Sequence, residues 1–191
     1  MESLLANKQL WNIPNILTLM RVVLIPVIVL LAYLPAFKWQ NWLIASIFLL
    51  AAITDWFDGY LARALNQTSA FGRFLDPVAD KLMVAAALVL LVQASPRLEM
   101  VLPAIVIISR EITISALREW MAELGKRANV AVSHIGKWKT TAQMTAITVL
   151  LTQETMLLYL GYFLLYVAVI LTIWSMIIYL RAAWPELSKP D

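Results

Sequence analysis

The length of the apolar runs is the feature that most limits what this chain can fold into. Several runs approach roughly 20 residues, which is the length at which an α-helix crosses the hydrocarbon core of a bilayer. Hydrophobic residues make up 62% of the 191-residue sequence, whereas soluble domains are about 45–50% apolar. Backbone polar groups must pair internally in lipid, so these runs are expected to be helical. The sequence therefore predicts one all-α, polytopic integral membrane domain over residues 1–191.

The apolar runs predict six transmembrane helices. We expect them over residues 16–34, 42–61, 77–93, 100–121, 139–152 and 156–181. The fifth is unusually polar, and we interpret its polar face as buried among helices or lining a cavity; this face consists of Thr140, Thr141, Gln143, Thr145 and Thr148. Residues 1–12 are compatible with an interfacial helix lying on the membrane or with a frayed tail.

The distribution of basic residues predicts the orientation of the chain. Of its 15 lysines and arginines, only Lys38 and Arg97 fall on one side of the predicted spans, and Arg110 lies inside the fourth. The remainder fall on the other side, so the positive-inside rule puts both termini in the cytoplasm. Without cysteine the chain has neither disulfides nor thiolate metal sites. With a net charge of only +3, no nucleic-acid partner is expected.

Four aspartates lie around the connection between the second and third spans. Asp55 and Asp58 are three residues apart and Asp76 and Asp80 four apart, so each pair shares a helix face. The polar residues 66–72 between the pairs indicate a turn that folds one helix back on the other. Four carboxylates beside hydrocarbon repel one another, and hard divalent cations with oxygen ligands offset such charge. The stretch predicts a metal site at the four aspartates, on the cytoplasmic side.

Local interpretations of single residues remain open here. Asp58-Gly59 is also an ordinary turn signal, and Asp76-Pro77 is also typical of a helix cap followed by a proline in the first turn. These interpretations do not explain why acids recur at helical spacing on both sides of one turn. We therefore favour the metal site.

The complete pattern D-x-x-D-G-x-x-A-R-x8-G-x3-D-x3-D runs from Asp55 to Asp80. It resembles, without a gap, the signature of the CDP-alcohol phosphotransferase family, and the residues near both ends are most similar to the bacterial branch that uses glycerol 3-phosphate. The resemblance implies phosphatidyl transfer from CDP-diacylglycerol to sn-glycerol 3-phosphate, giving phosphatidylglycerol phosphate and CMP in anionic phospholipid biosynthesis. It also implies two Mg²⁺ or Mn²⁺ ions and a homodimer in the bacterial inner membrane.

The resemblance assigns roles to the matching positions. Asp55, Asp58 and Asp76 are implied as ligands shared between the two ions, and Asp80 as a ligand and the general base. Positions implied to bind CDP-diacylglycerol are Asn15, Thr18, Gly59, Ala62, Arg63, Thr68 and Ser69. For Asn15 and Thr18, which stand in the segment P-N-I-L-T, helix capping is the alternative.

The acceptor pocket is predicted from a second cluster. Arg110 and Glu111 lie inside the fourth span, where ionisable side chains are costly and usually functional. Glu111, Ser115 and Arg118 follow at helical spacing. Lys137 and Lys139 come across the loop, where the fifth span begins. We expect Arg110, Arg118 and Lys137 to bind the phosphate of the acceptor. The alternative is that Arg110 pairs with an acid structurally and that Lys137 only follows the positive-inside rule.

Two other functions remain possible on the residues alone. The motif handles the nucleotide and the metals, so the acceptor could instead be inositol phosphate or serine. A divalent-cation transporter is a hypothesis of another class, which predicts carboxylates near the bilayer midplane and repeat symmetry. Here the acids cluster at one edge beside glycine, alanine and arginine, which favours the enzyme.

Overall fold

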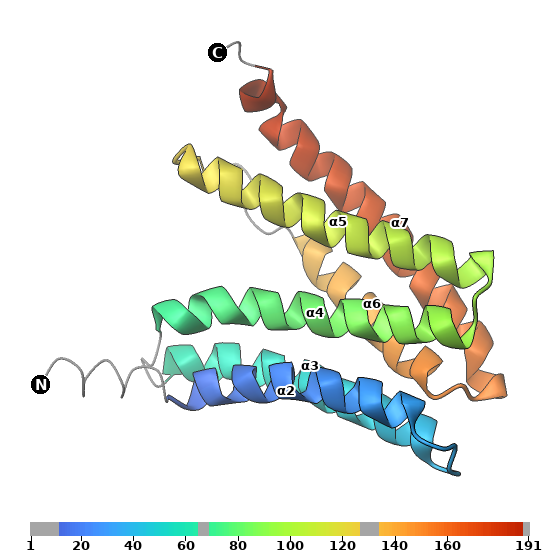
Figure 1. Cartoon of the computed structure of the whole chain (residues 1–191). Coiled ribbons are helices and arrows are strands. Elements are labelled where there is room, and N and C mark those ends of the chain that lie inside the picture. The colour runs from blue at the N-terminus through green and yellow to red at the C-terminus, as the bar shows by residue number, and fades with distance from the viewer. Residues whose placement is uncertain (1–11, 65–68, 127–133, 189–191) are drawn as a thin grey trace, which may run out of the picture. The chain divides into compact units, whose positions relative to one another are not determined.

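The computed structural model describes residues 12–64, 69–126 and 134–188, although the side chains of 13, 56, 58–64 and 134–137 lie outside its described part. Over the described residues the chain forms α-helices without any strand (Figure 1). In chain order these are α2 (Ile13–Tyr33), α3 (Gln40–Ala64), α4 (Ala70–Ala94), α5 (Leu98–Glu123), α6 (His134–Leu151) and α7 (Thr155–Leu187). Residues 1–12, for which an interfacial helix and a frayed tail were both open, lie outside the described residues, apart from Asn12.

Three of these helices are long and apolar enough to cross a membrane on length and composition alone. They are α2 from Pro14, α5 and α7. In the described part of α3 the apolar stretch is shorter, over Gln40–Asp55. The all-helical fold of a polytopic membrane protein is therefore confirmed, with the charged residues concentrated on particular helices.

The helix that contains the predicted third span, α4, begins before that span, at Ala70. Ser69 caps this helix, because its Oγ accepts a hydrogen bond from the backbone N–H of Gly72 at 2.9 Å. The turn expected over residues 66–72 thus ends earlier, and Asp76-Pro77 lies inside the helix and does not cap it. The capping alternative for Asp76-Pro77 is therefore wrong, and the side chain of Asp76 instead contacts α2 through Thr18.

The polar face of α6 is also less buried than predicted. Gln143 is buried, but Thr140, Thr141 and Thr145 are exposed. The hydroxyls of Thr145 and Thr148 each donate to the carbonyl four residues earlier, at 2.8 Å. A threonine that bonds its own helix backbone needs no buried partner elsewhere, which explains the difference.

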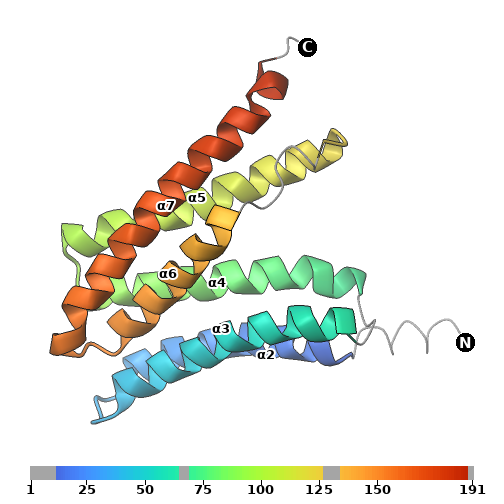
Figure 2. The same cartoon turned by 180° about the vertical axis from the view of Figure 1, so that it is seen from behind.

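Packing divides the chain into two compact units. In the first, Met1–Leu91 with Leu151–Gln153, α2 packs along α3 (Figures 1 and 2). The tight connection is closed by Gln40, whose Nε2 donates to the carbonyls of Leu31 and Leu34 at 2.6 and 3.2 Å. Ile28 and Phe48 are fully buried. This hairpin carries the first part of the candidate site.

The second unit, Val92–Leu150 with Glu154–Asp191, is built on the packing of α5 against α7. An ion pair between Lys126 Nζ and Glu186 Oε1, 2.5 Å long, joins the ends of the two helices. Between them lies an apolar cluster of Ile114, Leu117, Met121, Tyr179 and Ala183. The cluster fixes Tyr179 beside the basic residues of α5.

Gly161 allows α7 to pack closely on the end of α6. A Cβ at this position would lie 2.7 Å from two side-chain atoms of Leu150. An alanine in a helix is worth about 1 kcal/mol over glycine, but overpacking costs about 1–3 kcal/mol. We therefore expect Gly161→Ala to lower the thermal unfolding midpoint of the protein in detergent.

A matched control is the same substitution in a Leu150→Ala background. Shortening Leu150 removes the clashing atoms, so Gly161→Ala is expected to become neutral or stabilising there, a non-additivity typical of residues in contact. Equal effects of Gly161→Ala in both backgrounds would contradict this packing account.

Candidate functional site

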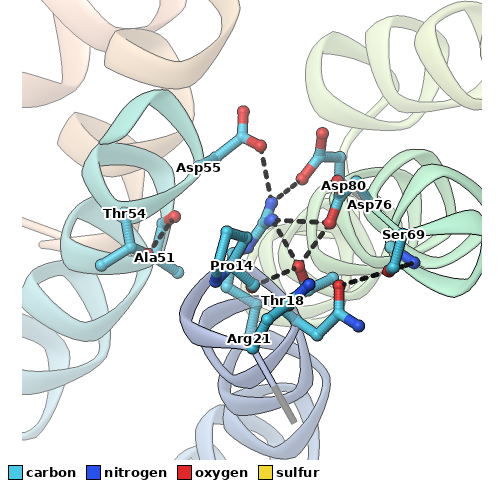
Figure 3. A network of polar contacts seen from close by, with 12 residues as sticks. Pro14, Thr18, Arg21, Ala51, Thr54, Asp55, Ser69, Asp76 and Asp80 are labelled. Carbon is cyan, nitrogen blue, oxygen red and sulfur yellow. Dashed lines mark hydrogen bonds and ion pairs between the residues drawn. The ribbon is translucent and has the colours of Figure 1, made fainter. Parts of the chain in front are cut away.

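A buried arginine on α2 lies at the centre of the acidic residues (Figure 3). Nη1 of Arg21 donates to Asp55 Oδ1 at 2.7 Å and also to Asp80 Oδ1, while Nη2 is 3.6 Å from Asp76 Oδ1. The side chain of Arg21 is 2% exposed, whereas those of the three aspartates are 35–41% exposed. One guanidinium therefore collects carboxylates from α3 and α4.

Two further polar contacts join α2 to the beginning of α4. The hydroxyl of Thr18 donates to Asp76 Oδ1, and Asn15 Oδ1 accepts from Ser69 Oγ at 2.9 Å. Gly72 lies directly against Asn15, because a Cβ at this position would overlap Asn15 Oδ1 and lie 3.1 Å from Ser69 Oγ. A glycine is thus needed where α4 lies against Asn15 of α2.

The capping alternative for the P-N-I-L-T segment is wrong. Asn12 is the N-cap of α2, since its Oδ1 accepts from the backbone N–H of Asn15 at 2.9 Å. The side chains of Asn15 and Thr18 are instead buried and directed at α4. They are close to the acidic cluster, as expected of residues that shape one site.

The importance of Arg21 was missed in the sequence, where it counted only toward membrane orientation. Asn15, Thr18 and Arg21 follow one another at three-residue spacing, so they lie along one side of α2. An ionisable side chain inside an apolar span is itself a signal of function or pairing. Part of the charge expected to need a metal is therefore offset by the chain itself.

The donor chemistry of the cluster fits a hard divalent cation. Three ionised carboxylates against one guanidinium leave a net charge of −2 on the described side chains. Asp55 and Asp80 each turn one oxygen toward Arg21 and the other away (Figure 3). Oxygen-only ligands with excess negative charge are what Mg²⁺ and Mn²⁺ prefer.

The carboxylates whose side chains are described do not, however, form a preassembled ligand cage. Within the described residues, no three side chains among the aspartates, glutamates and histidines are grouped so that they could hold an ion. Asp55, Asp76 and Asp80 meet through the guanidinium of Arg21. Asp58 belongs to α3, but its side chain lies outside the described part, so its role as a ligand stays a prediction.

The other positions predicted to bind CDP-diacylglycerol lie only partly within the described residues. Gly59, Ala62 and Arg63 belong to the C-terminal part of α3, and their side chains lie outside the described part. Thr68 lies outside the described residues altogether. For these positions the roles implied by the resemblance stay predictions.

A second polar cluster lies within the second unit. Arg110 is buried on α5, where its Nη1 is 3.1 Å from Glu111 Oε1 and its Nη2 donates to Ser175 Oγ at 2.9 Å. Lys139, buried on α6, contacts the same oxygen of Glu111. The alternative that Arg110 pairs with an acid is therefore observed, and its buried Nε has no hydrogen-bond partner.

Arg118 lies two turns further along α5 and is held differently. Its Nη2 donates to the hydroxyl of Tyr179 at 2.7 Å, and its guanidinium carbon is 5.0 Å from the centroid of that ring. With Arg110 and Lys139, and only Glu111 against them, the described charges sum to +2. Such a cluster suits an anion.

The predicted participation of Lys137 is not tested, because its side chain lies outside the described part. Lys139, which was expected in the basic group but not among the residues that bind the phosphate, takes part in the cluster. Lys139 and Gln143 are four residues apart on the buried face of α6. This four-residue spacing is the sequence signal that distinguishes Lys139 from Lys137.

Comparison with known proteins gives the same family over nearly the whole chain. The sequence profile of the CDP-alcohol phosphatidyltransferase family matches residues 11–174, which include the charged residues of both polar clusters. The CDP-diacylglycerol–glycerol-3-phosphate 3-phosphatidyltransferase of Pectobacterium atrosepticum is 58% identical over 181 residues, 94% of this chain and 99% of the relative.

Proteins of the same name from two other bacteria are similarly related. That of Yersinia enterocolitica is 58% identical over 180 residues, 94% of this chain and 98% of the relative. That of Salmonella choleraesuis is 57% identical over 178 residues, 93% of this chain and 97% of the relative. The chain therefore belongs to the CDP-alcohol phosphatidyltransferase family.

Proposed function

We propose that this protein transfers the phosphatidyl group of CDP-diacylglycerol to sn-glycerol 3-phosphate, forming phosphatidylglycerol phosphate and releasing CMP. The observation that carries the proposal is the convergence of Asp55, Asp76 and Asp80 from two helices on one point. The relatives named for this reaction support it, because they are 57–58% identical over almost their full length.

We infer that the acidic cluster binds two Mg²⁺ or Mn²⁺ ions. Asp55, Asp58, Asp76 and Asp80 would hold them, and the net charge of −2 on the described part of this cluster supports the inference. When bound, the ions would offset the charge of the diphosphate and polarise the lipid-side phosphorus. The carboxylates are more exposed than Arg21, so this side of the cluster is open to ligands.

Asp80 is the proposed general base. As the hydroxyl oxygen of glycerol 3-phosphate bonds to the lipid-side phosphorus, the bond to the CMP oxygen breaks and the hydroxyl proton passes to the carboxylate. The side chain of Asp80 is 35% exposed and directs one oxygen away from Arg21 (Figure 3).

The CDP-diacylglycerol site would lie beside the acids. Asn15 and Thr18 are buried and hold α4 in register with α2, while Ser69 ends the same network. Gly59 and Ala62 add little bulk, so the backbone of α3 can approach a flat base or a phosphate. Arg63 would bind phosphate oxygens. Thr68 is the remaining residue proposed to bind CDP-diacylglycerol.

The basic cluster of the second unit is the proposed site for the acceptor phosphate. Its described charge of +2 complements a phosphate dianion. Arg110 is already anchored by Glu111 and Ser175, so it contributes mainly charge. Arg118, together with Lys137, is the better candidate for direct contact.

Transfer of labelled glycerol 3-phosphate into lipid tests the activity. Purified protein in detergent is expected to form labelled lipid only with CDP-diacylglycerol and Mg²⁺, and to prefer glycerol 3-phosphate over inositol phosphate and serine. Asp80→Asn is expected to lower kcat by at least about a hundredfold, because a general base contributes roughly 10²–10⁴-fold. Near wild-type turnover in this variant would remove the assignment of Asp80, and a divalent-cation flux without lipid product would favour a transporter.

Arg118→Gln tests the acceptor site. Loss of a hydrogen bond to a charged group is worth about 1.5–3 kcal/mol, so KM for glycerol 3-phosphate is expected to rise roughly tenfold or more. KM for CDP-diacylglycerol should stay unchanged. The control is Tyr179→Phe, which removes only the hydroxyl that Arg118 contacts; an equal rise of KM in both variants would indicate that Arg118 acts only by supporting the packing of α5 and α7.

The proposed location is the bacterial inner membrane, with both termini and the acidic motif in the cytoplasm and two copies forming a homodimer. The chain lacks cysteine, so single cysteines can report orientation. An impermeant maleimide is expected to label Lys38→Cys in intact spheroplasts but Glu123→Cys only after lysis. The reverse pattern would invert the topology, and the mass of the purified protein in detergent tests the homodimer.

A further inference from the structure

Arg21 has no role in the proposed transfer, although it is the residue that all three described carboxylates share. We propose that Arg21 is a positioning residue, a built-in counter-ion that holds Asp55, Asp76 and Asp80 together in the metal-free protein and opposes divalent ions at the same carboxylates. The inference rests on the proposed function, because the ions belong to it. It concerns the chain's own residues and can be tested without catalysis.

The geometry makes Arg21 a link between helices. Its Nη1 alone donates to Asp55 on α3 and to Asp80 on α4, and Nη2 lies 3.6 Å from Asp76. The planar guanidinium offers several donors in a fixed fork, so it can serve more than one carboxylate at once. Lysine would bring the same charge as a single point. The three acids are therefore gathered by one rigid group.

The charges give Arg21 two opposite effects. Without Arg21 the net charge of the described cluster would change from −2 to −3. Repulsion among the carboxylates would then favour separation of α3 from α4. Arg21 therefore stabilises the metal-free protein. The same positive charge repels a divalent ion that approaches the exposed side of the carboxylates, so it weakens ion binding.

This pair of effects distinguishes a counter-ion from a merely structural residue. Loss of a structural contact would lower stability and leave ion affinity unchanged or reduced. Loss of a counter-ion lowers stability in chelator but raises the affinity for a divalent ion. An ion that binds only the folded state then restores stability in proportion to its affinity.

The test compares Arg21→Met and Arg21→Lys with the wild type, in detergent and without substrate. Thermal unfolding is measured in chelator and across a Mn²⁺ series, and the Kd of Mn²⁺ is measured by electron paramagnetic resonance. Compared with the wild type, Arg21→Met is expected to unfold at a lower temperature in chelator and to bind Mn²⁺ roughly tenfold more tightly. Its unfolding temperature should also rise more than that of the wild type when Mn²⁺ is added. Arg21→Lys should have an unfolding temperature and a Kd of Mn²⁺ between those of the wild type and Arg21→Met.

Arg73→Met is the matched control, since Arg73 is exposed on α4 near the acids. It should leave both the unfolding temperature and the Kd of Mn²⁺ unchanged. If Arg21→Met does not fold in chelator, the double variant Arg21→Met/Asp55→Asn, which returns the described charge to −2, is expected to fold.

Three results would overturn the proposal: unchanged stability of Arg21→Met in chelator, equal or weaker Mn²⁺ binding by it, or no rescue by Asp55→Asn. A wild-type protein that binds no Mn²⁺ would overturn it as well. Absence of phosphatidyl transfer with these Mn²⁺ effects intact would count against the proposed function alone.

Discussion

Repulsion among carboxylates beside hydrocarbon is the constraint on which the first unit depends. Acids on α3 and α4 can lie close together only where positive charge lies between them. The buried guanidinium of Arg21 supplies one such charge, and Thr18 adds a hydroxyl donor to Asp76. The helical hairpin of α2 and α3 is therefore more than a membrane anchor, because it carries the counter-ion that the acids require.

The two polar clusters are complementary in sign to the substrates proposed for them. The described acids and Arg21 sum to −2, which suits divalent ions, and the described basic cluster sums to +2, which suits a phosphate dianion. Neither cluster is neutralised internally, although each contains one residue of the opposite sign, Arg21 in the first and Glu111 in the second. Partial compensation of this kind keeps ionised groups tolerable in a membrane protein while leaving charge for a ligand.

Most of the fold and the core of the site could be predicted from the sequence, for physical reasons. Apolar length and helical spacing are local properties, so the helices and the meeting of Asp55 with Asp76 and Asp80 followed from them. The partner of these acids could not be chosen, because Arg21 meets them from another helix and its local surroundings are those of any apolar span. Ser69 and Asp76 both carry a capping signal, and the contact between Asp76 and Thr18, which excludes Asp76 as the cap, is not visible in the sequence. The involvement of Lys139 depended on which face of α6 is buried.

Pro77, one residue beyond Asp76, lies inside α4 and has no backbone hydrogen to donate. The carbonyl oxygen of Arg73, one turn earlier, therefore lacks its usual intrahelical donor. A main-chain acceptor of this kind is poorly tolerated in hydrocarbon and needs water or a polar ligand group nearby. The start of α4 is thus suited to a hydrated boundary layer, where lipid headgroups and water are present, and this part of its backbone adds to the polar character that the aspartate side chains give it.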